Sequence, residues 1–250
     1  MATYNDAMVK LESLGDSGPT SLGKALEACS TITETLTKKT SPYGDSSRSE
    51  MLAFVPKDVR RVLDVGCHSG AFGRSIKARS SVEVWGVEPN PATADVAAKS
   101  LDRVFNDLFS EKLPIPDQYF DAIVFNDVLE HMPDPWEALR LANNKLARNG
   151  CVIVSIPNLR HIENLVHILK ERDFEYVDCG IRDKTHLRFF TEKSARRLFD
   201  DSGLKIVHMQ GINEDWWRPS LRRRLAFRFF KKYLADTKYV QLAIIAKKTD

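Results

Sequence analysis

Short runs of apolar residues alternate with helical segments between residues 61 and 157, and this alternation constrains the fold more than any other feature of the sequence. The apolar runs are nearly continuous, which is typical of strands buried on both faces of a parallel sheet. We therefore predict an α/β fold, in which helices cover both faces of a doubly wound, seven-stranded sheet. The predicted strands are residues 62–65, 82–87, 103–105, 120–125, 151–156, 204–209 and 239–246.

Helix signals fall between these strands. Asn90 and Asp134 are each followed by a proline, and a capping Asn or Asp before a proline is a typical helix start. Gly150 is expected to lie just past the end of the second of these helices, and Thr191 to cap a later one. A weaker helical spacing predicts an N-terminal helix over residues 21–37.

The composition is that of an ordinary globular protein. The 250-residue chain is 43% hydrophobic and 28% charged, which argues against a disordered or fibrous chain. No apolar run approaches the roughly 20 residues of a membrane-spanning helix, and the N-terminus lacks the features of a secretory signal. Four scattered cysteines without a CxxC pair favour a reducing cytoplasm over a zinc site or disulfides.

The net charge of +3 conceals a basic segment, residues 218–232, that contains no acid. Three roles compete for it: a solvated helix that packs on the domain, a site for phosphate-bearing or lipid-linked substrates with peripheral membrane contact, and nucleic-acid contact. Trp216 and Trp217 just upstream could seat a sugar ring, meet a membrane interface or simply pack. The basic residues are Arg218, Arg222, Arg223, Arg224, Arg228, Lys231 and Lys232.

Ligand-binding groups stand at the carboxyl ends of the predicted strands, where doubly wound folds bind ligands. Gly66 and Gly70 flank the turn after the first strand, where glycines let a ligand approach the backbone. Glu88 ends the second strand, where a carboxylate can accept both hydroxyls of a ribose. Asp107, after the third strand, could receive an exocyclic amine. Together, these groups indicate a ligand-binding site much more specifically than the two glycines alone.

The sequence around these groups resembles the class I S-adenosylmethionine-dependent methyltransferases, in the small-molecule branch that includes ubiquinone and sugar methyltransferases. Residues 62–70 (VLDVGCHSG) resemble motif I, and residues 120–135 resemble motif IV with its extension. Glu88-Pro89 matches the ribose-binding acid, and residues 106–108 match the adenine-contacting segment. The resemblance covers roughly residues 43–210. It implies a Rossmann-like fold and S-adenosylmethionine as cofactor.

The resemblance also implies which residues hold the cofactor. Tyr43 and Arg48 precede motif I, where related enzymes often fold a segment over the cofactor. Arg48 could pair with the methionine carboxylate, the alternative being an exposed loop arginine. No metal ligands are expected. The expected cofactor-binding residues are Asp64, Gly66, Cys67, Ser69, Gly70, Glu88, Pro89, Asp107, Leu108, Asn126, Asp127 and Arg48.

One position departs from the family pattern. His68 stands where the family most often has glycine, and we expect its side chain to point to solvent. A dinucleotide site needs a second glycine there to make room for a pyrophosphate, so His68 disfavours a NAD-dependent enzyme. His68 is also the one feature that favours a non-catalytic, methyltransferase-like binding module.

Methyl transfer requires alignment of the acceptor and, for a hydroxyl or a protonated amine, removal of a proton. His131, just past the fourth strand, and His186, after the fifth, are the candidate catalytic bases. The alternatives are structural roles, with His131 packing near the cofactor and His186 tying down a loop. His161 and His167 lie off the expected apolar stripe of their helix, so we expect them to be solvated. The residues of that stripe are Ile162, Leu165, Val166 and Leu169. Whether a base is needed stays open.

The favoured acceptor is a hydroxyl of a sugar or surface-polysaccharide precursor, by resemblance of residues 182–190 to that branch. A lipid or quinone acceptor is the alternative. Nucleic acid is disfavoured because the Asn/Asp-Pro-Pro-aromatic motif that holds a flipped base is missing after the fourth strand.

The expected organisation is an N-terminal helical arm with a cofactor-covering loop (1–58) and a methyltransferase domain (59–250). Within that domain we place a substrate cap (159–203) and a basic insert (214–236). The sequence leaves open whether the arm is a lid or the contact of a homodimer.

Overall fold

The computed structural model describes residues 47–214 and 220–249. The expected N-terminal helix over residues 21–37 lies outside the described residues, as do Tyr43, Trp216, Trp217 and most of the arm assigned to residues 1–58. Within the described part of the chain, no helix is long and apolar enough to cross a membrane.

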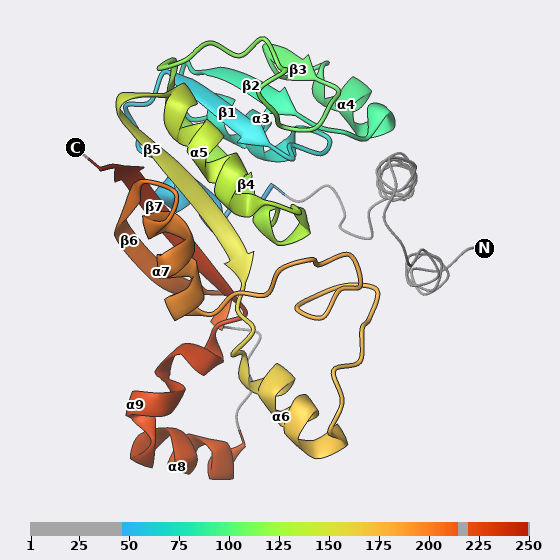
Figure 1. The fold of residues 1–250 in the computed structure, drawn as a ribbon, viewed down its shortest axis with the longest axis vertical. Helices are drawn as coiled ribbons and strands as arrows, with labels where there is room; N and C mark the ends of the chain where they lie inside the picture. Colours follow the sequence, from blue (N-terminus) through green and yellow to red (C-terminus); the bar gives the residue numbers. More distant parts are fainter. Residues whose placement is uncertain (1–46, 215–219, 250) are drawn as a thin grey trace, which may run out of the picture. The chain divides into compact units, whose positions relative to one another are not determined.

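Seven strands form one sheet in the order β3-β2-β1-β4-β5-β7-β6 (Figure 1). β1 to β5 pair in parallel, and β7 runs antiparallel to both of its neighbours, β5 and β6. The strand order reverses between β1 and β4, which makes the sheet doubly wound and confirms the predicted α/β class. The strands are β1 (Arg61–Val65), β2 (Glu83–Val87), β3 (Arg103–Phe105), β4 (Phe120–Asn126), β5 (Leu146–Pro157), β6 (Leu204–Ile212) and β7 (Gln241–Lys248).

The expected helix caps are present. Asn90 accepts a hydrogen bond from the amide of Ala92 at 3.0 Å, and Asp134 accepts one from Glu137 at 2.8 Å. Thr191 forms a capping box with Ser194. The helices are α3 (Ala71–Lys77), α4 (Pro91–Ala97), α5 (Pro135–Lys145), α6 (Ile162–Glu171), α7 (Glu192–Asp200), α8 (Leu221–Phe229) and α9 (Lys231–Leu234), with 3-10 turns η1 (Met51–Phe54), η2 (Leu129–His131) and η4 (Ala235–Lys238).

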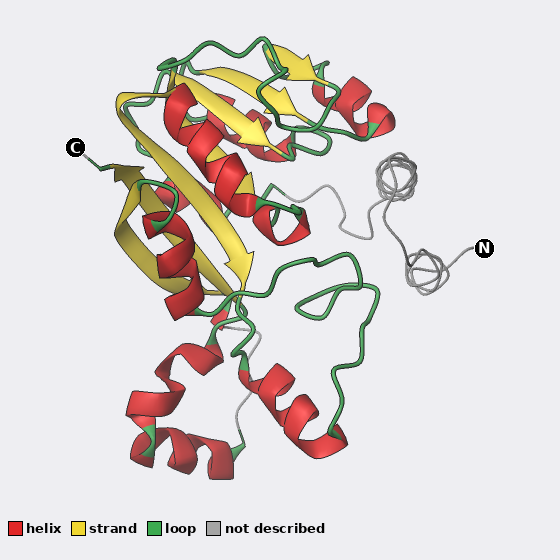
Figure 2. Cartoon of the chain, viewed as in Figure 1, coloured by secondary structure: helices red, strands yellow, loops and turns green. Residues whose placement is uncertain are grey.

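The core lies on both faces of the sheet (Figure 2). Successive residues of a strand point to opposite faces, so Leu63 and Val65 of β1 belong to one cluster and Val62 to the other. Leu139 of α5 and Phe199 of α7 cover the first face. The second is covered by α3, α4 and η1. The central strands β1, β2, β4 and β5 are therefore largely buried on both sides, as their apolar composition predicts, whereas β3 and β6 at the edges of the sheet have exposed residues.

The fifth strand begins earlier than expected. β5 starts at Leu146, so Gly150 lies inside the strand and is not the end of a helix. A Cβ atom at Gly150 would lie 2.8 Å from the carbonyl oxygen of Phe120, where the β4–β5 register shifts before Ala122. Glycine is needed because the two backbones approach closely at this irregularity.

Helix α6 turns a different face inward from the one expected. Leu169 is 80% exposed, whereas His161 and Asn164 are buried. The side chain of Asn164 donates to the carbonyl of Leu159 at 2.7 Å. The polar face of α6 that carries Asn164 therefore lies against the residues that precede the helix. His167 is partly buried. The expectation that His161 and His167 are solvated is therefore wrong.

The basic insert forms two helices, α8 and α9, which lie beyond the carboxyl end of β5 (Figure 1). Leu221, Phe229 and Tyr233 are each more than half exposed. The role of the segment, as a solvated helix, a substrate site or a nucleic-acid contact, stays a prediction. An ion pair between Arg160, in the segment after β5, and Asp236 of η4 joins the insert to that segment.

Candidate active site

The carboxyl ends of β1 to β4 lie side by side. Val65 pairs with Val87 and Phe125, and Val87 pairs with Phe105. The residues that follow these strand ends are therefore neighbours, as the sequence predicts. Backbone and side-chain hydrogen bonds link them: the amide of Gly66 donates to the carbonyl of Val87 at 2.8 Å, and the side chain of Asn106 donates to the carbonyl of Glu88 at 2.9 Å.

The turn after β1 requires glycine at both of its ends. Gly66 and Gly70 have φ angles of +73° and +79°, which L side chains rarely adopt. A Cβ atom at Gly66 would also lie 2.6 Å from Cγ2 of Val128. His68 lies in the left-handed region as well, at φ +49°, and its side chain is partly buried instead of fully exposed. The turn thus has the shape that three glycines would adopt most easily.

Glu88 is held at the end of β2 by this turn. Its Oε2 accepts from the amide of His68 and its Oε1 from the amide of Asn90, both at 2.9 Å. Each carboxylate oxygen has a second lone pair. The carboxylate is thus fixed in orientation and still able to accept hydroxyl groups of a ligand.

Two polar side chains at the ends of β1 and β4 have buried atoms without partners. These atoms are Oδ2 of Asp64 and both the oxygen and the nitrogen of the Asn126 amide. Burial, together with the negative charge of Glu88, raises the pKa of Asp64 from 3.8 to about 7. Buried polar atoms normally have hydrogen-bond partners, so these atoms fit a bound group that offers a cation and hydrogen-bonding atoms.

Arg48 is engaged by protein groups. Its guanidinium forms an ion pair with Asp127, donates to Oγ of Ser155 at 3.0 Å and donates to Glu50 at 2.7 Å. Asp127 also accepts from the side chain of Gln241 at 2.6 Å. The assignment of Arg48 to a methionine carboxylate stays a prediction, because Nε, Nη1 and Nη2 of the guanidinium already donate to Glu50, Asp127 and Ser155.

The other expected cofactor residues differ in exposure. Asp107 and Leu108 are exposed beyond β3, where Asp107 accepts from the amide of Leu108 at 2.7 Å. Cys67 is buried against Gly86 of β2, where a Cβ atom would lie 2.5 Å from its sulfur. Burial raises the pKa of the Cys67 thiol, so its side chain behaves as a small apolar group. Ser69 is buried, and Pro89 follows Glu88 in the chain.

The two histidines expected to act as bases lie together. The ring centroids of His131 and His186 are 4.7 Å apart. The amides of Leu187 and Arg188 both donate to the carbonyl of Glu130, which joins the loop after α6 to η2 and brings His186 to this position. Burial lowers the pKa of both histidines, and His186 lowers that of His131 further.

Glu130 completes this cluster and was missed in the sequence. It is 1% exposed, and neither carboxylate oxygen has a hydrogen-bond partner. Burial, and then the charge of Asp127, raise the pKa of Glu130 well above its usual range. One carboxylate oxygen of Glu130 and one ring nitrogen each of His131 and His186 lie within 4.8 Å of one another. These three residues could hold a metal ion. The available signal was an acid directly before His131 and after the apolar pair Val128-Leu129.

Aromatic rings adjoin the cluster. The ring of Phe189 lies 6.2 Å from that of His186, and the rings of Phe174 and Tyr176 lie 5.0 Å and 6.3 Å from that of Phe189. Tyr176 is 54% exposed. These residues belong to the expected substrate cap and offer flat apolar surface next to the histidines.

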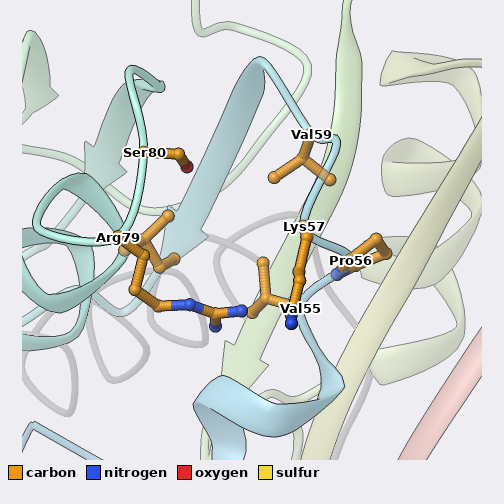
Figure 3. A pocket seen from close by; sticks show the side chains of 7 residues that line it. Val55, Pro56, Lys57, Val59, Arg79 and Ser80 are labelled. Carbon is orange, nitrogen blue, oxygen red and sulfur yellow. The ribbon is translucent and has the colours of Figure 1, made fainter.

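A hollow of about 290 Å³ lies near the amino ends of the strands (Figure 3). Val55 and Val59 line it from the segment before β1, and Arg79 and Ser80 line it from the loop between α3 and β2. These segments precede the strands, so the hollow adjoins their amino ends. It does not coincide with the candidate active site, which lies at their carboxyl ends.

Comparison with known proteins gives a consistent family. A family model described as "Methyltransferase domain" matches residues 36–209. A ubiquinone biosynthesis O-methyltransferase from Aeromonas salmonicida is 28% identical over 162 residues, which cover 62% of this chain and 66% of that protein. One of the same name from Alkalilimnicola ehrlichii is 32% identical over 161 residues, covering 61% and 64%. The chain thus matches just under two thirds of the length of these two relatives.

Solved structures give the same fold. A crystal structure of a SAM-dependent methyltransferase from Archaeoglobus fulgidus superposes with a TM-score of 0.57 at 20% identity, over 88% of this chain and 99% of that one. At this level of identity, the likeness concerns the fold. It agrees with the Rossmann-like sheet expected from the sequence.

Proposed function

The chain belongs to the methyltransferase domain family, and from this premise we propose that it transfers a methyl group from S-adenosylmethionine to a ring hydroxyl of a quinone-type small molecule. The relatives named ubiquinone biosynthesis O-methyltransferase support this acceptor. They favour the quinone alternative over the sugar acceptor that the sequence first suggested. The observation that carries the proposal is the position of the aromatic cap residues beside His131 and His186.

The strand ends fit the cofactor. When bound, S-adenosylmethionine supplies an electrophilic methyl carbon on a sulfonium. Glu88 would accept the ribose hydroxyls, and the unpartnered Oδ2 of Asp64 would face the methionine ammonium. The positive φ angles of Gly66 and Gly70 give the turn the shape around which the ligand would bind. Asp107 and Leu108, exposed beyond β3, would meet the adenine.

The cap fits a flat acceptor. A quinol ring could lie against Phe189 and Tyr176 with its hydroxyl directed to the histidines, because aromatic rings pack favourably at the distances seen in this cluster. Holding the hydroxyl in line with the methyl carbon is the main contribution that the protein can make to such a displacement. The hydroxyl must also lose its proton, and His131 and His186 are the groups near enough to assist.

Methyl transfer from radiolabelled S-adenosylmethionine tests the proposal. The purified chain is incubated with a catechol bearing a short polyprenyl tail and, separately, with a panel of nucleotide sugars. We expect label in the catechol and none in the sugars. Label in a sugar alone would overturn the quinone acceptor, and no label in either, while calorimetry detects cofactor binding, would overturn it as well.

A pair of variants links that activity to the assigned site. Glu88→Ala removes the carboxylate that would accept the ribose and also releases the amides of His68 and Asn90. We expect cofactor affinity to fall by about 100-fold or more, because a buried hydrogen-bonded charge is lost. Glu192→Gln is the matched control, since its partly exposed side chain pairs with Arg196 in α7, away from the strand ends, and it should bind the cofactor normally.

A further inference from the structure

We propose that Glu130, His131 and His186 bind a divalent transition-metal ion, such as Zn²⁺, and leave a coordination position open to the acceptor. The sequence suggested the two histidines as bases and no metal ligands. Three observations lead to a metal site instead of a pair of bases. They are the burial of the Glu130 carboxylate without a hydrogen-bond partner, the hydrogen bonds of the two histidines, and the kinds of donor atom that the three residues offer.

Glu130 is a buried carboxylate without a hydrogen-bond partner. The side chain is 1% exposed, and neither of its carboxylate oxygens makes a hydrogen bond. A buried carboxylate without partners is costly, and such groups are normally paired or bound to metal. The nearby Asp127 is occupied by Arg48 and Gln241. A cation between Glu130 and the histidines would supply the missing partner.

Both histidines are held as metal-binding histidines usually are. Nδ1 of His186 lies 3.1 Å from the carbonyl oxygen of Ile181, and Nδ1 of His131 lies 3.2 Å from that of Thr185. A carbonyl only accepts, so each Nδ1 carries the proton and each Nε2 keeps a free lone pair. Metal ligands commonly donate their second ring nitrogen to a backbone carbonyl in this way, which fixes the tautomer and the ring orientation.

A second layer of hydrogen bonds supports the loop that carries His186. The amide and the hydroxyl of Thr185 both donate to Oδ1 of Asp183, at 2.8 Å and 2.7 Å. Asp183 is itself buried. Because the Thr185 hydroxyl donates to Asp183, it can accept from Nδ1 of His131, 3.2 Å away. The orientation of His131 is thus fixed through the loop that carries His186.

The donor set selects the kind of metal. Two imidazoles and one carboxylate, with donor atoms within 4.8 Å of one another, suit zinc and the neighbouring first-row divalent ions. Mg²⁺ and Ca²⁺ prefer oxygen donors throughout. Three protein ligands leave a fourth position, which is the arrangement of catalytic rather than structural zinc sites.

The role of the ion rests on the proposed function. The open position would take the acceptor hydroxyl, and a coordinated hydroxyl has a lowered pKa and loses its proton to water. The resulting oxyanion forms the O–CH₃ bond, while the C–S bond of the sulfonium breaks and its electron pair stays on sulfur as a neutral thioether. The metal would then replace a histidine base, because the free nitrogen of each ring is used in coordination.

Metal binding is tested on the full chain after the metal has been removed with EDTA and dialysis. Co²⁺ and Zn²⁺ are then titrated in by calorimetry, and Co²⁺ also by its visible absorption. We expect one equivalent to bind and the Co²⁺ spectrum to be that of a four- or five-coordinate site. Glu130→Gln, His131→Ala and His186→Ala should each weaken binding by about 100-fold or more.

Two controls separate loss of ligands from loss of fold. His208→Gln alters an exposed histidine outside the cluster, which hydrogen-bonds to Gln210 and contacts the ring of Phe54, and it should bind Co²⁺ as the parent does. Each ligand variant should retain S-adenosylmethionine binding, because none of the three ligands is among the residues assigned to the cofactor. Absence of stoichiometric Co²⁺ binding, or binding that survives Glu130→Gln and His186→Ala, would overturn the site.

The function and the site can fail separately. Co²⁺ binding without methyl transfer to any acceptor would leave the site in place and overturn the proposed function. Full methyl transfer by a chain shown by elemental analysis to contain no metal would overturn the role of the ion. Loss of transfer on metal removal and its recovery with Zn²⁺ would support both.

Discussion

The imidazole rings of His131 and His186 lie 4.7 Å apart at an interplanar angle of 72°, although one follows β4 and the other belongs to the loop before α7. The carbonyl of Glu130 determines this contact, because it accepts the amides of both Leu187 and Arg188. The backbone of one residue thus positions the second histidine, while its side chain stays buried near the two rings and without a hydrogen-bond partner.

Glu130→Met should stabilise the metal-free protein. Methionine fills a similar volume without a charge, so the cost of burying an unpartnered carboxyl disappears, and we expect a gain of about 1–3 kcal/mol in the free energy of unfolding. Urea denaturation in EDTA measures it. Zn²⁺ should raise the melting temperature of the parent and leave that of the variant unchanged. A loss of stability in EDTA would contradict the prediction.

His68→Gly should relieve the strain of the turn after β1. His68 has a φ of +49°, a conformation that costs an L residue about 1 kcal/mol and glycine nothing. Because glycine is more flexible in the unfolded chain, we expect a net gain of at most about 1 kcal/mol in urea denaturation. Ser69→Gly is the control. Ser69 is absent from the positive-φ residues of the described chain, so this change should lower the stability.

Gly66→Ala should destabilise the protein by about 2 kcal/mol or more. The new methyl group would lie 2.6 Å from Cγ2 of Val128, and the φ of +73° is unfavourable for alanine. A second substitution, Val128→Ala, should restore the stability that is lost through the steric contact. It should not restore the stability that is lost through the unfavourable φ. Equal unfolding free energies for the single and double variants would show that the contact with Val128 contributes nothing.

Asp64→Asn should remove a pH dependence of stability. Burial and the charge of Glu88 raise the pKa of Asp64 from 3.8 to about 7. The folded protein therefore loses stability as the pH rises from the unfolded pKa near 4 to about 7, because the unfolded carboxyl ionises first. At about 1.4 kcal/mol per pKa unit, the loss is on the order of 4 kcal/mol. In cofactor-free protein, the difference between variant and parent should grow by that order between pH 4 and pH 8. A constant difference would contradict the assignment.

Arg48→Lys distinguishes two roles of the arginine. If Arg48 acts only by holding Asp127 and Ser155, the variant should lose about 1–3 kcal/mol of stability, since a single ammonium cannot make the same set of hydrogen bonds. Its affinity for S-adenosylmethionine should then change little. A loss of affinity well beyond the change in stability would instead support the pairing with the methionine carboxylate that the sequence suggests.

Much of the sheet could be predicted from the sequence because its signals are local. The apolar runs around Leu63 and Val124, the proline-marked helix starts and the glycines of the first turn each depend on nearby residues. The end of β5 could also be placed, from Pro157. Its start could not, because Gly150 is a typical residue both after a helix and at a close approach of two strands.

The candidate site was predictable only in part. Glu88 and Asp64 follow from their places at strand ends, since parallel strands in register bring their carboxyl ends together. The meeting of Glu130 with His186 depends on how the loop after α6 returns to η2, which no periodicity encodes. The face that α6 buries was likewise decided by polar contacts of Asn164, whereas the spacing of apolar residues pointed to Leu169.

The position of β7 has a consequence for how the chain is made. β6 precedes β7 in sequence, yet β7 alone joins it to the sheet. During synthesis on the ribosome, residues 204–212 therefore emerge with no strand to pair with and must wait until residues 241–248 have followed. Until β7 pairs with it, the free edge of β5 is open to other chains, which exposes the nascent protein to misassembly.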